Sequence, residues 1–333
     1  MRNIKIVILL VLVFISVFAI KAIGKEKIFS QTANISDNVI LQSADGNAAF
    51  ADQNNQEILS RNEMAISPDL LTNMKCGDNL VLSAHLALVR FLNNNNRTYE
   101  INANSYWPIA SITKLMTAIV AKENIDPLKQ ITFSDDEILG QNSAENFKSG
   151  ETYKAGDLMK SMLLLSSNDA AESLSNNLPD NLTGDSSRNK FIELMNSKAR
   201  DLNLSETVYF DPTGLSAKNQ STPNNIFKII SYLYQNYPDI LKITSQKTLP
   251  IIELNLKKKI NVSNMNEFAG QADFIGGKTG YIDEAQGNLV SLFNVKKEPV
   301  VIVVLGSQDR FGDTRKLLDC VKNPDGVQSD ISE

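Results

Sequence analysis

The chain has 333 residues, of which 42% are hydrophobic and 21% are charged, and its formal net charge is -5. This length allows one large domain or two ordinary ones, and the composition excludes collagen-like and fully disordered classes. The acidic balance, and a sequence without a basic stripe interleaved with aromatic residues, give no reason to expect nucleic acid as a partner.

The first segment in chain order, residues 1–27, has basic residues on both sides of the apolar run Ile6–Ala19. A helix over residues 4–23, with its flanking lysines reaching the interface, would span a membrane. A cleavable signal peptide is the alternative, but no small-residue cleavage site follows the run. We therefore expect an N-terminal membrane anchor, or secretion if the segment is cleaved. Either outcome places the rest of the chain on the extracytoplasmic side.

Residues 28–79 are rich in Ser, Asn, Asp and Gln and are predicted to be a polar spacer. The folded domain is expected over residues 80–325, with a short tail at 326–333. At its start, strand-like residues on both sides of an asparagine cluster predict a β-hairpin over 80–92 and 97–101.

Helical and strand-like segments then follow in blocks. Apolar residues recur at helical spacing in residues 111–122, 155–165, 169–178, 190–202 and 224–234. Strand-like runs return at residues 248–258, 260–266, 287–295 and 299–307, before an amphipathic helix at 313–323. The order of hairpin, helical insert, strands and closing helix predicts an α+β fold whose antiparallel sheet is built from both ends of the domain.

The residue types available limit the chemistry. His85 is the only histidine, and Cys76 and Cys320 are the only cysteines. A zinc site would have to take most of its ligands from carboxylates, against the usual preference, so no metal or other cofactor is expected. A Ser-His-Asp triad could use only His85, which lies in an apolar strand-like stretch and is predicted to be structural. Hydrolysis would therefore need a general base other than histidine.

Ser111 and Lys114 lie three positions apart in the apolar stretch "WPIASITKLMTAIVA". On a helix they share one face, and Pro108 places Ser111 in the first turn, where free N–H groups favour a developing anion. Lys114 could then act as base for a serine nucleophile. To be neutral near pH 7, a lysine must lose about 4 to 5 kcal/mol of preference for its charged form, which requires burial and a second cation nearby.

The S-x-x-K spacing alone is a weak indication, because Ser187 and Lys190 share it. That second pair lies in the polar stretch "GDSSRNK", which offers no apolar surroundings to its lysine. We predict a structural role there, with the serine as a cap and the lysine solvated.

Two further stretches add polar groups at the edges of predicted elements. "MLLLSSNDAAESL" places Ser166 and Asn168 between two helices, where the structural alternative is an N-cap. "GGKTGY" places Lys278, Thr279 and Gly280 just before or on a strand, where the alternative is a turn. A glycine there lets a substrate backbone approach, and Lys278 would supply the second cation beside Lys114.

These motifs, in this order, resemble the serine D-alanyl-D-alanine carboxypeptidases, the low-molecular-mass penicillin-binding proteins of peptidase family S11. The resemblance extends from about Leu80 to Asn323 and rests on the blocks "WPIASITKLMTA", "SGETYKAGDLMKSMLLLSSNDAAESL", "FIELMNSKARDLNLSETVYFDPTGL", "NMN", "GGKTGY" and "VVLGSQDRFGDTRKLLD". It implies a β-lactamase/transpeptidase-like fold with an inserted all-helical subdomain. It also implies a peptidoglycan stem peptide as substrate and β-lactams as covalent inhibitors.

The resemblance also implies roles residue by residue. Ser111 would be the acyl-ester nucleophile and Lys114 its base, and Ser166 would relay a proton to the leaving D-alanine. The substrate-binding positions would be Asn168, Lys278, Thr279, Gly280, Tyr281 and Arg310. The oxyanion hole would be the backbone N–H groups of Ser111 and Tyr281, and Arg310 and Thr279 would bind the terminal carboxylate.

Departures from the family pattern, and the cysteines, lead to further expectations. The usual "EAGYNL" reads "EAQGNL" here, so that Gln286 and Gly287 put local strand packing and substrate contacts in question. In this fold the elements that carry Cys76 and Cys320 lie on the same side of the sheet, and an exported chain permits a disulfide between them.

Three rival functions remain open. A class A β-lactamase shares the motifs but needs an E-x-x-L-N loop, and Glu193, with Asn196 after it, lies in a predicted helix instead. A D,D-endopeptidase of the same family would use the same catalytic set on a cross-linked peptide. A penicillin-binding module without turnover is the non-enzyme alternative.

Overall fold

The computed structural model describes residues 72–73, 76, 80–93, 97–138, 147–179 and 184–323. The chain divides into two units, residues 1–65 and 66–333, and every described residue lies in the second. The predicted anchor, most of the predicted spacer and the predicted tail lie outside the described residues, so the domain boundaries stay predictions. Within the described ranges, no helix is both long enough and apolar enough to cross a membrane.

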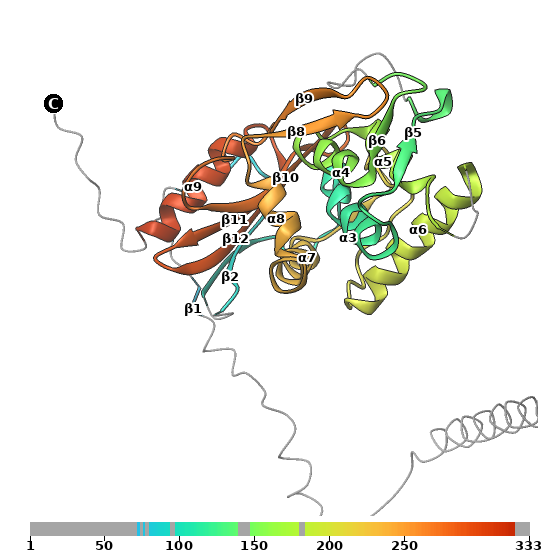
Figure 1. Ribbon diagram of the computed structural model, residues 1–333. Coiled ribbons are helices and arrows are strands. Elements are labelled where there is room, and N and C mark those ends of the chain that lie inside the picture. The colour runs from blue at the N-terminus through green and yellow to red at the C-terminus, as the bar shows by residue number, and fades with distance from the viewer. Residues whose placement is uncertain are drawn as a thin grey trace, which may run out of the picture. The chain divides into compact units, whose positions relative to one another are not determined.

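A six-stranded sheet lies at the centre of the described domain (Figure 1). Its strands, in spatial order, are β1 (Thr72–Asn73), β3 (Arg97–Ile101), β2 (Leu86–Phe91), β12 (Glu298–Ser307), β11 (Gln286–Val295) and β10 (Phe274–Ile282). Neighbouring strands are antiparallel except β1 and β3, which are parallel. Because β12 pairs with β2, the sheet joins the two ends of the domain, which confirms the predicted α+β fold.

The sheet is covered on both faces, which explains the unbroken apolar run in β12. Val301, Val303 and Leu305 belong to the core beneath the inserted helices. The alternate residues Val300, Ile302 and Val304 belong to a second core that includes Leu317 of the closing helix. Successive side chains of a strand point to opposite faces, so a strand buried on both faces needs apolar residues at every position.

The predicted helices are present, with boundaries that differ by a few residues. One face of the sheet carries α3 (Lys114–Asn124), α4 (Ala155–Leu164), α5 (Asn168–Ser175), α6 (Gly184–Asp201), α7 (Pro223–Asn236) and α8 (Pro238–Thr244), and α9 (Arg310–Lys322) lies on the other. The short helix α8 was not predicted. It follows α7 after a single residue because Pro238 cannot continue α7 but fits the first position of a new helix.

The insert is mainly helical, as predicted, and also contains short strand pairs. These are β4 (Trp107–Pro108) with β7 (Gln220–Ser221), β5 (Gln130–Thr132) with β6 (Thr152–Lys154), and β8 (Thr248–Glu253) with β9 (Lys258–Ser263). A 3₁₀ turn, η3 (Asp135–Glu137), follows β5. The strand-like run at residues 248–266 therefore forms a separate hairpin and adds no strand to the central sheet.

Residues that precede the predicted domain start at Leu80 also join the fold. Thr72 and Asn73 pair with β3, and a disulfide links Cys76 to Cys320 in α9. The two Cα atoms lie 5.2 Å apart, within the range that a disulfide needs. The predicted disulfide is therefore confirmed, and it fixes the chain at the entrance to the domain.

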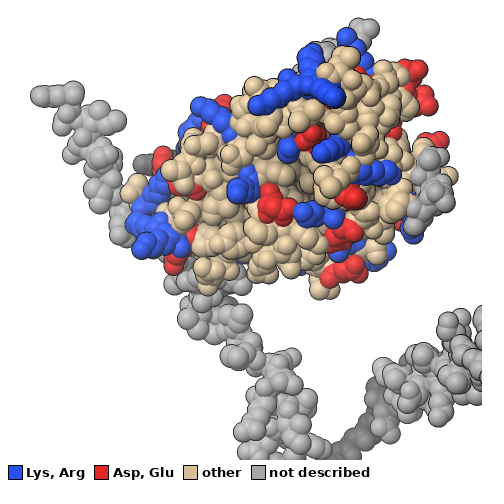
Figure 2. All heavy atoms as spheres, in the orientation of Figure 1, with Lys and Arg blue, Asp and Glu red and all other residues tan. Residues whose placement is uncertain are grey.

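Most charged side chains of the described domain are at its surface. On the face shown in Figure 2, basic side chains gather over α9 and over the β8–β9 hairpin, with acidic side chains between them. Lys114 and Lys278 differ from these, since their exposed fractions are only 0% and 2%. A lysine almost never occupies such a position without specific partners, and both of these residues belong to the predicted site.

Candidate active site

Ser111 lies in a 3₁₀ turn, η2 (Ala110–Thr113), that leads directly into α3. The sequence predicted the first turn of an α-helix, so the local geometry is tighter than expected. Residues three apart eclipse one another in a 3₁₀ turn, which brings the side chain of Lys114 next to that of Ser111. Ala110, just before Ser111, has a φ of 48°, a left-handed conformation that non-glycine residues rarely adopt.

Lys114 is fully buried and its amine is surrounded by oxygen atoms. Its Nζ donates to Ser111 Oγ at 3.0 Å, to Asn168 Oδ1 at 2.7 Å and to the carbonyl oxygen of Thr213 at 2.6 Å. The amide and carbonyl oxygens can only accept hydrogen bonds, whereas a hydroxyl can also donate. A neutral amine would therefore give its two hydrogens to Asn168 and Thr213 and turn its lone pair toward the hydroxyl of Ser111.

Ser166 lies in the junction between α4 and α5, as the sequence predicted. Its Oγ accepts a hydrogen bond from Lys278 Nζ at 2.9 Å, and its φ is 63°. The next residue, Ser167, is the N-cap of α5 and accepts from the backbone N–H of Ala170. The two interpretations of this motif thus apply to adjacent residues: Ser167 caps the helix and Ser166 faces Lys278.

Lys278 lies within β10 and is fully buried. Its Nζ also donates to the carbonyl oxygen of Thr279 at 3.0 Å. Burial lowers the pKa of Lys278 well below its ordinary value, and the charges of Lys114 and Arg310 lower it further. The amines of Lys114 and Lys278 are therefore close enough for their charges to interact, so protonation of one disfavours protonation of the other.

The strand β10 passes directly alongside the turn that carries Ser111. A Cβ atom added at Gly280 would lie 2.9 Å from the carbonyl oxygen of Ile109 and 3.1 Å from the backbone nitrogen of Ser111. Only glycine allows this approach. Thr279 is buried, and Tyr281 follows Gly280 with 60% of its surface exposed. The predicted oxyanion donors, the N–H groups of Ser111 and Tyr281, thus belong to two segments in contact.

Arg310 reaches the same strand from the first residue of α9. Its Nη1 donates to the carbonyl oxygen of Gly280 at 2.9 Å, and its burial lowers the pKa of the guanidinium. The unusual residues Gln286 and Gly287 pair with Ile282 and Tyr281 in the β10–β11 ladder. Strand pairing therefore continues through the position where the sequence departs from the family pattern.

Residues that the sequence set aside as structural lie in other surroundings. The ring of His85, just before β2, stacks on Trp107 at a centroid distance of 5.0 Å. Glu193 lies on α6, and its exposed carboxylate accepts from Lys190 at 3.2 Å. Among the described residues, no three or more His, Cys, Asp or Glu side chains come together as a group that could hold a metal ion.

Sequence reasoning assigned no role to the segment around Thr213, although its carbonyl oxygen contacts Lys114. The stretch "FDPTGL" combines Asp211, Pro212 and Gly214, which are typical of a turn. A turn signature of this kind predicts a loop but does not predict which carbonyl group the loop presents. The contact could therefore be found only in three dimensions.

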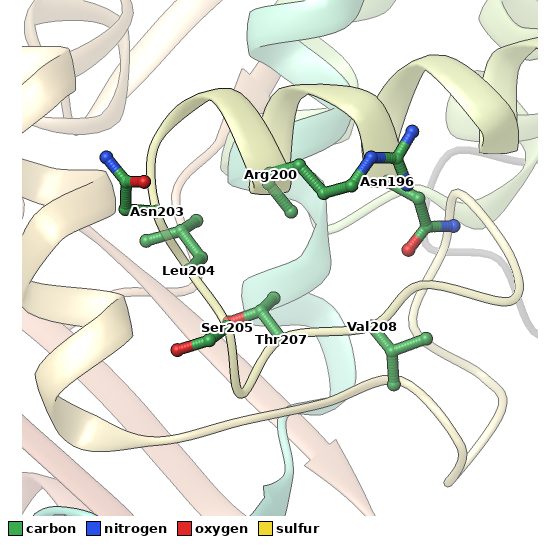
Figure 3. A pocket seen from close by; sticks show the side chains of 8 residues that line it. Asn196, Arg200, Asn203, Leu204, Ser205, Thr207 and Val208 are labelled. Atoms are coloured by element: carbon green, nitrogen blue, oxygen red, sulfur yellow. The ribbon is translucent and has the colours of Figure 1, made fainter. Parts of the chain in front are cut away.

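A separate hollow of about 600 Å³ lies between the end of α6 and the following segment (Figure 3). Its lining includes Leu204 and Val208, with Arg200 and Asn196 at the helix side. None of the predicted site residues lines it. The candidate site is therefore the cluster around Ser111, which lies between η2, the α4–α5 junction and β10.

Comparison with known proteins agrees with this arrangement. A family model described as D-alanyl-D-alanine carboxypeptidase, peptidase S11, matches residues 77–309, which include every candidate residue except Arg310. A D-alanyl-D-alanine endopeptidase of Pseudomonas aeruginosa is 32% identical over 249 residues, which are 71% of this chain and 76% of that relative. The D-alanyl-D-alanine carboxypeptidase DacF of Bacillus subtilis is 28% identical over 66% of this chain and 57% of its own length. Among solved structures, penicillin-binding protein D2 from Listeria monocytogenes in its ampicillin-bound form has a TM-score of 0.62 and 29% identity, over 72% of this chain and 98% of that one.

Proposed function

Because the chain belongs to the D-alanyl-D-alanine carboxypeptidase family S11, we propose that it removes the terminal D-alanine from peptidoglycan stem pentapeptides through an acyl-enzyme on Ser111. The observation that carries this proposal is the contact of 3.0 Å between Lys114 Nζ and Ser111 Oγ, made by a lysine that is fully buried. A buried lysine with a second cation nearby is the base that a serine nucleophile needs in the absence of histidine.

In the first step, Ser111 Oγ attacks the carbonyl carbon of the penultimate D-alanine and transfers its proton to the neutral amine of Lys114. The carbonyl oxygen becomes an oxyanion, for which the backbone N–H groups of Ser111 and Tyr281 are the proposed donors. The contact of Gly280 with the backbone of Ile109 and Ser111 supports this pairing of donors, because it holds the two segments together.

In the second step, the peptide bond breaks, and the proton that Lys114 received from Ser111 passes to the leaving amine of the terminal D-alanine, which makes Lys114 neutral again. Ser166 is the proposed relay, since its hydroxyl can both donate and accept. The 2.9 Å contact from Lys278 Nζ to Ser166 Oγ supports this role. Water then attacks the acyl-enzyme, releases the shortened peptide and returns Ser111 to its hydroxyl form.

Recognition of the substrate carboxylate is proposed for Arg310 and Thr279, with Asn168 at the substrate amide. A carboxypeptidase must bind a free carboxylate, and guanidinium and hydroxyl donors do so through charge-assisted hydrogen bonds. The bond from Arg310 to the carbonyl oxygen of Gly280 supports this role, because it holds the guanidinium beside the strand along which the substrate would lie. The same nucleophile would be acylated by a β-lactam, as the ampicillin-bound relative suggests.

The second candidate is a D,D-endopeptidase that cleaves cross-linked stem peptides. The relative from Pseudomonas aeruginosa, at 32% identity, carries the name endopeptidase, whereas the one from Bacillus subtilis, at 28%, carries the name carboxypeptidase. Both activities use the same catalytic residues and differ in the leaving group, which is a free D-alanine in one case and a cross-linked peptide in the other.

Product analysis on purified muropeptides distinguishes the candidates. A carboxypeptidase releases D-alanine from a monomeric pentapeptide, and an endopeptidase converts a cross-linked dimer into monomers. A binding module without turnover is labelled by fluorescent penicillin but gives neither product. Failure of the wild-type protein to be labelled would contradict the serine-acylation proposal altogether.

For location, we propose attachment to the cell membrane through residues 1–27, with the peptidase domain on the extracytoplasmic side. The apolar run between basic residues supports this proposal. Expression of the chain with and without residues 1–27, followed by membrane fractionation, tests it. Recovery of the full chain in the soluble fraction at its full mass would contradict it.

A further inference from the structure

The loop formed by residues 211–219 packs against the turn that carries the nucleophile. Thr117 Oγ1 in α3 donates to the carbonyl oxygen of Pro212 at 2.6 Å. The backbone N–H of Ile109 donates to the carbonyl oxygen of Asn219 at 2.9 Å. The loop is therefore attached to residues on both sides of Ser111, and its conformation determines where the carbonyl group of Thr213 lies.

Asp211 organises this loop from the inside. Its side chain is only 7% exposed, and its Oδ1 accepts from the backbone N–H of Thr213 at 2.7 Å and of Gly214 at 2.6 Å. The same oxygen accepts from Thr213 Oγ1 at 2.7 Å, and Oδ2 accepts from the backbone N–H of Ser216 at 2.9 Å. Four donors thus converge on one carboxylate, and three of them flank the Thr213 carbonyl group.

A carboxylate suits these four donors because it accepts through both oxygens and donates nothing. An asparagine could replace Oδ1 with its amide oxygen, but its NH₂ group would then face the N–H of Ser216. The contacts therefore indicate that the charge and the two-sided acceptor geometry of Asp211 both matter to the loop.

Gly214 shows how closely the loop approaches the nucleophile. Its φ is 85°, and an added Cβ atom would lie 2.0 Å from the carbonyl oxygen of Ala110 and 2.9 Å from the backbone nitrogen of Ser111. No side chain fits there, so a small displacement of the loop would move it into or away from the backbone that carries Ser111.

We propose that Asp211 is a positioning residue for acylation: it holds the Thr213 carbonyl group as an acceptor for Lys114 and so directs the lone pair of that amine at Ser111. The inference rests on the proposed function of Ser111 and Lys114. Lys114 Nζ lies 2.6 Å from the Thr213 oxygen and 2.7 Å from Asn168 Oδ1. With both acceptors fixed, the neutral amine uses its two hydrogens in the bonds to Thr213 and Asn168. The lone pair then faces the serine hydroxyl.

The first test compares Asp211→Ala with Asp157→Ala in the full-length protein. Asp157 is a matched control: it is also 7% exposed and accepts from the backbone N–H of Ile252 and from Lys160, but it lies at the start of α4. The measurement is the rate constant for acylation by a fluorescent penicillin, with thermal unfolding recorded in parallel. We expect a loss of about 100-fold for Asp211→Ala, as is typical when a reacting group is misplaced by about 1 Å, and a loss of less than about threefold for Asp157→Ala.

The pH profile of acylation supplies a readout that general destabilisation would not move. A carbonyl oxygen that accepts from an amine favours the charged form of that amine, so displacement of the Thr213 carbonyl group from Lys114 is expected to move the rising limb of the profile to lower pH. Among the other charged groups, Lys278 interacts with Lys114, and Arg188 interacts with Asp211 and with Glu172. Both remain in the variant, so the direction of the shift reports on Asp211.

Asp211→Asn is a second variant that tests the inference if Asp211→Ala does not fold. Its amide oxygen retains the place of Oδ1 but its NH₂ group faces the N–H of Ser216, so we expect acylation to fall by about three- to tenfold and the profile to shift in the same direction. Wild-type rates and an unshifted profile in Asp211→Asn or Asp211→Ala would overturn the inference, as would an equal loss in Asp157→Ala. If the wild-type protein itself is not labelled, the proposed function fails, which is a distinct result.

Discussion

The domain contains two S-x-x-K pairs at the start of helical segments, and the comparison between them shows what spacing alone does not provide. Ser111 and Lys114 are in contact with each other, and the lysine is fully buried. In the second pair, Ser187 accepts from the backbone N–H of Leu178 and donates to the carbonyl oxygen of Ser175. Its lysine points to solvent, with 51% of its side chain exposed and an ion pair to Glu193.

The difference lies in the surroundings and not in the motif. Ser187 is as buried as a core residue, but its hydroxyl is used to join the end of α5 to α6. It therefore has a structural role, as predicted, although it binds a neighbouring helix end and does not cap its own helix. Lys190 is half exposed and paired with Glu193, whereas Lys114 is fully buried and has Lys278 nearby. The proposed role of a lysine as base requires the surroundings of Lys114.

The largest contrast is expected between the two serines. Ser111→Ala should abolish labelling by fluorescent penicillin, because no other atom takes the place of the nucleophile. Ser187→Ala should leave the labelling rate unchanged but lower the free energy of unfolding by about 1 to 3 kcal/mol, since the buried N–H of Leu178 loses its acceptor. Gel fluorescence and chemical denaturation measure the two effects. Labelling that persists in Ser111→Ala would remove this serine from the nucleophile's role.

The two lysines should differ next most strongly. Lys114→Ala is expected to slow acylation by about 1000-fold, within the range typical for loss of a general base. Lys190→Ala should leave acylation unchanged and alter the free energy of unfolding by less than about 0.5 kcal/mol, because an exposed ion pair contributes little. Equal acylation rates in the two variants would show that the buried lysine is not the base.

A smaller effect is expected at Lys278, the second cation that only the first pair possesses. Lys278→Met removes the hydrogen bond to Ser166 and the charge near Lys114 while keeping a side chain of similar length. We expect acylation to fall by about 100-fold, in the range for loss of one positioned donor. The matched control is Lys190→Met, which should acylate at the wild-type rate. A wild-type rate in Lys278→Met would mean that Lys114 needs no second cation.

The sequence predicted the sheet and most helices, because each of these depends on local patterns, and the structure brings the proposed site residues Ser111 and Lys114, and Ser166 and Lys278, into contact. The apolar run of β12 and the helical spacing of α4 are visible in one stretch of chain, and the family blocks connect Ser111, Ser166 and Lys278. The 3₁₀ turn at Ser111 was not predicted, since a 3₁₀ turn and the first turn of an α-helix share the same residue pattern. The Thr213 carbonyl group was missed because every residue has a carbonyl group, and only the folded loop shows which one Lys114 meets.

Replacement of a buried lysine and replacement of an exposed one should affect the free energy of unfolding differently as the pH changes. The pKa of Lys278 in the folded protein lies well below its ordinary value, first because of burial and then because of Lys114 and Arg310. In the unfolded chain the pKa of this amine is about 10.4. At pH values between these two pKa values, the unfolded chain holds a proton on Lys278 that the folded protein does not hold. The free energy of unfolding therefore rises with pH over this range and falls as the pH falls.

Lys278→Met should therefore be more stable than wild type near neutral pH, by about 1 kcal/mol, as is common when an active-site residue is traded for stability. The advantage should shrink as the pH rises to and past about 10.4, because above that pH neither state of the wild-type protein carries the proton on this amine. The other titrating groups are common to both proteins, and among them Lys114 and Arg310, whose charges interact with Lys278, add their own change to the difference in free energy of unfolding. Lys190→Met, which changes an exposed lysine, should show no such trend.

A difference between Lys278→Met and wild type that stays constant with pH would mean that burial of Lys278 does not alter its protonation. The contrast between the two S-x-x-K pairs would then rest on hydrogen-bond geometry alone.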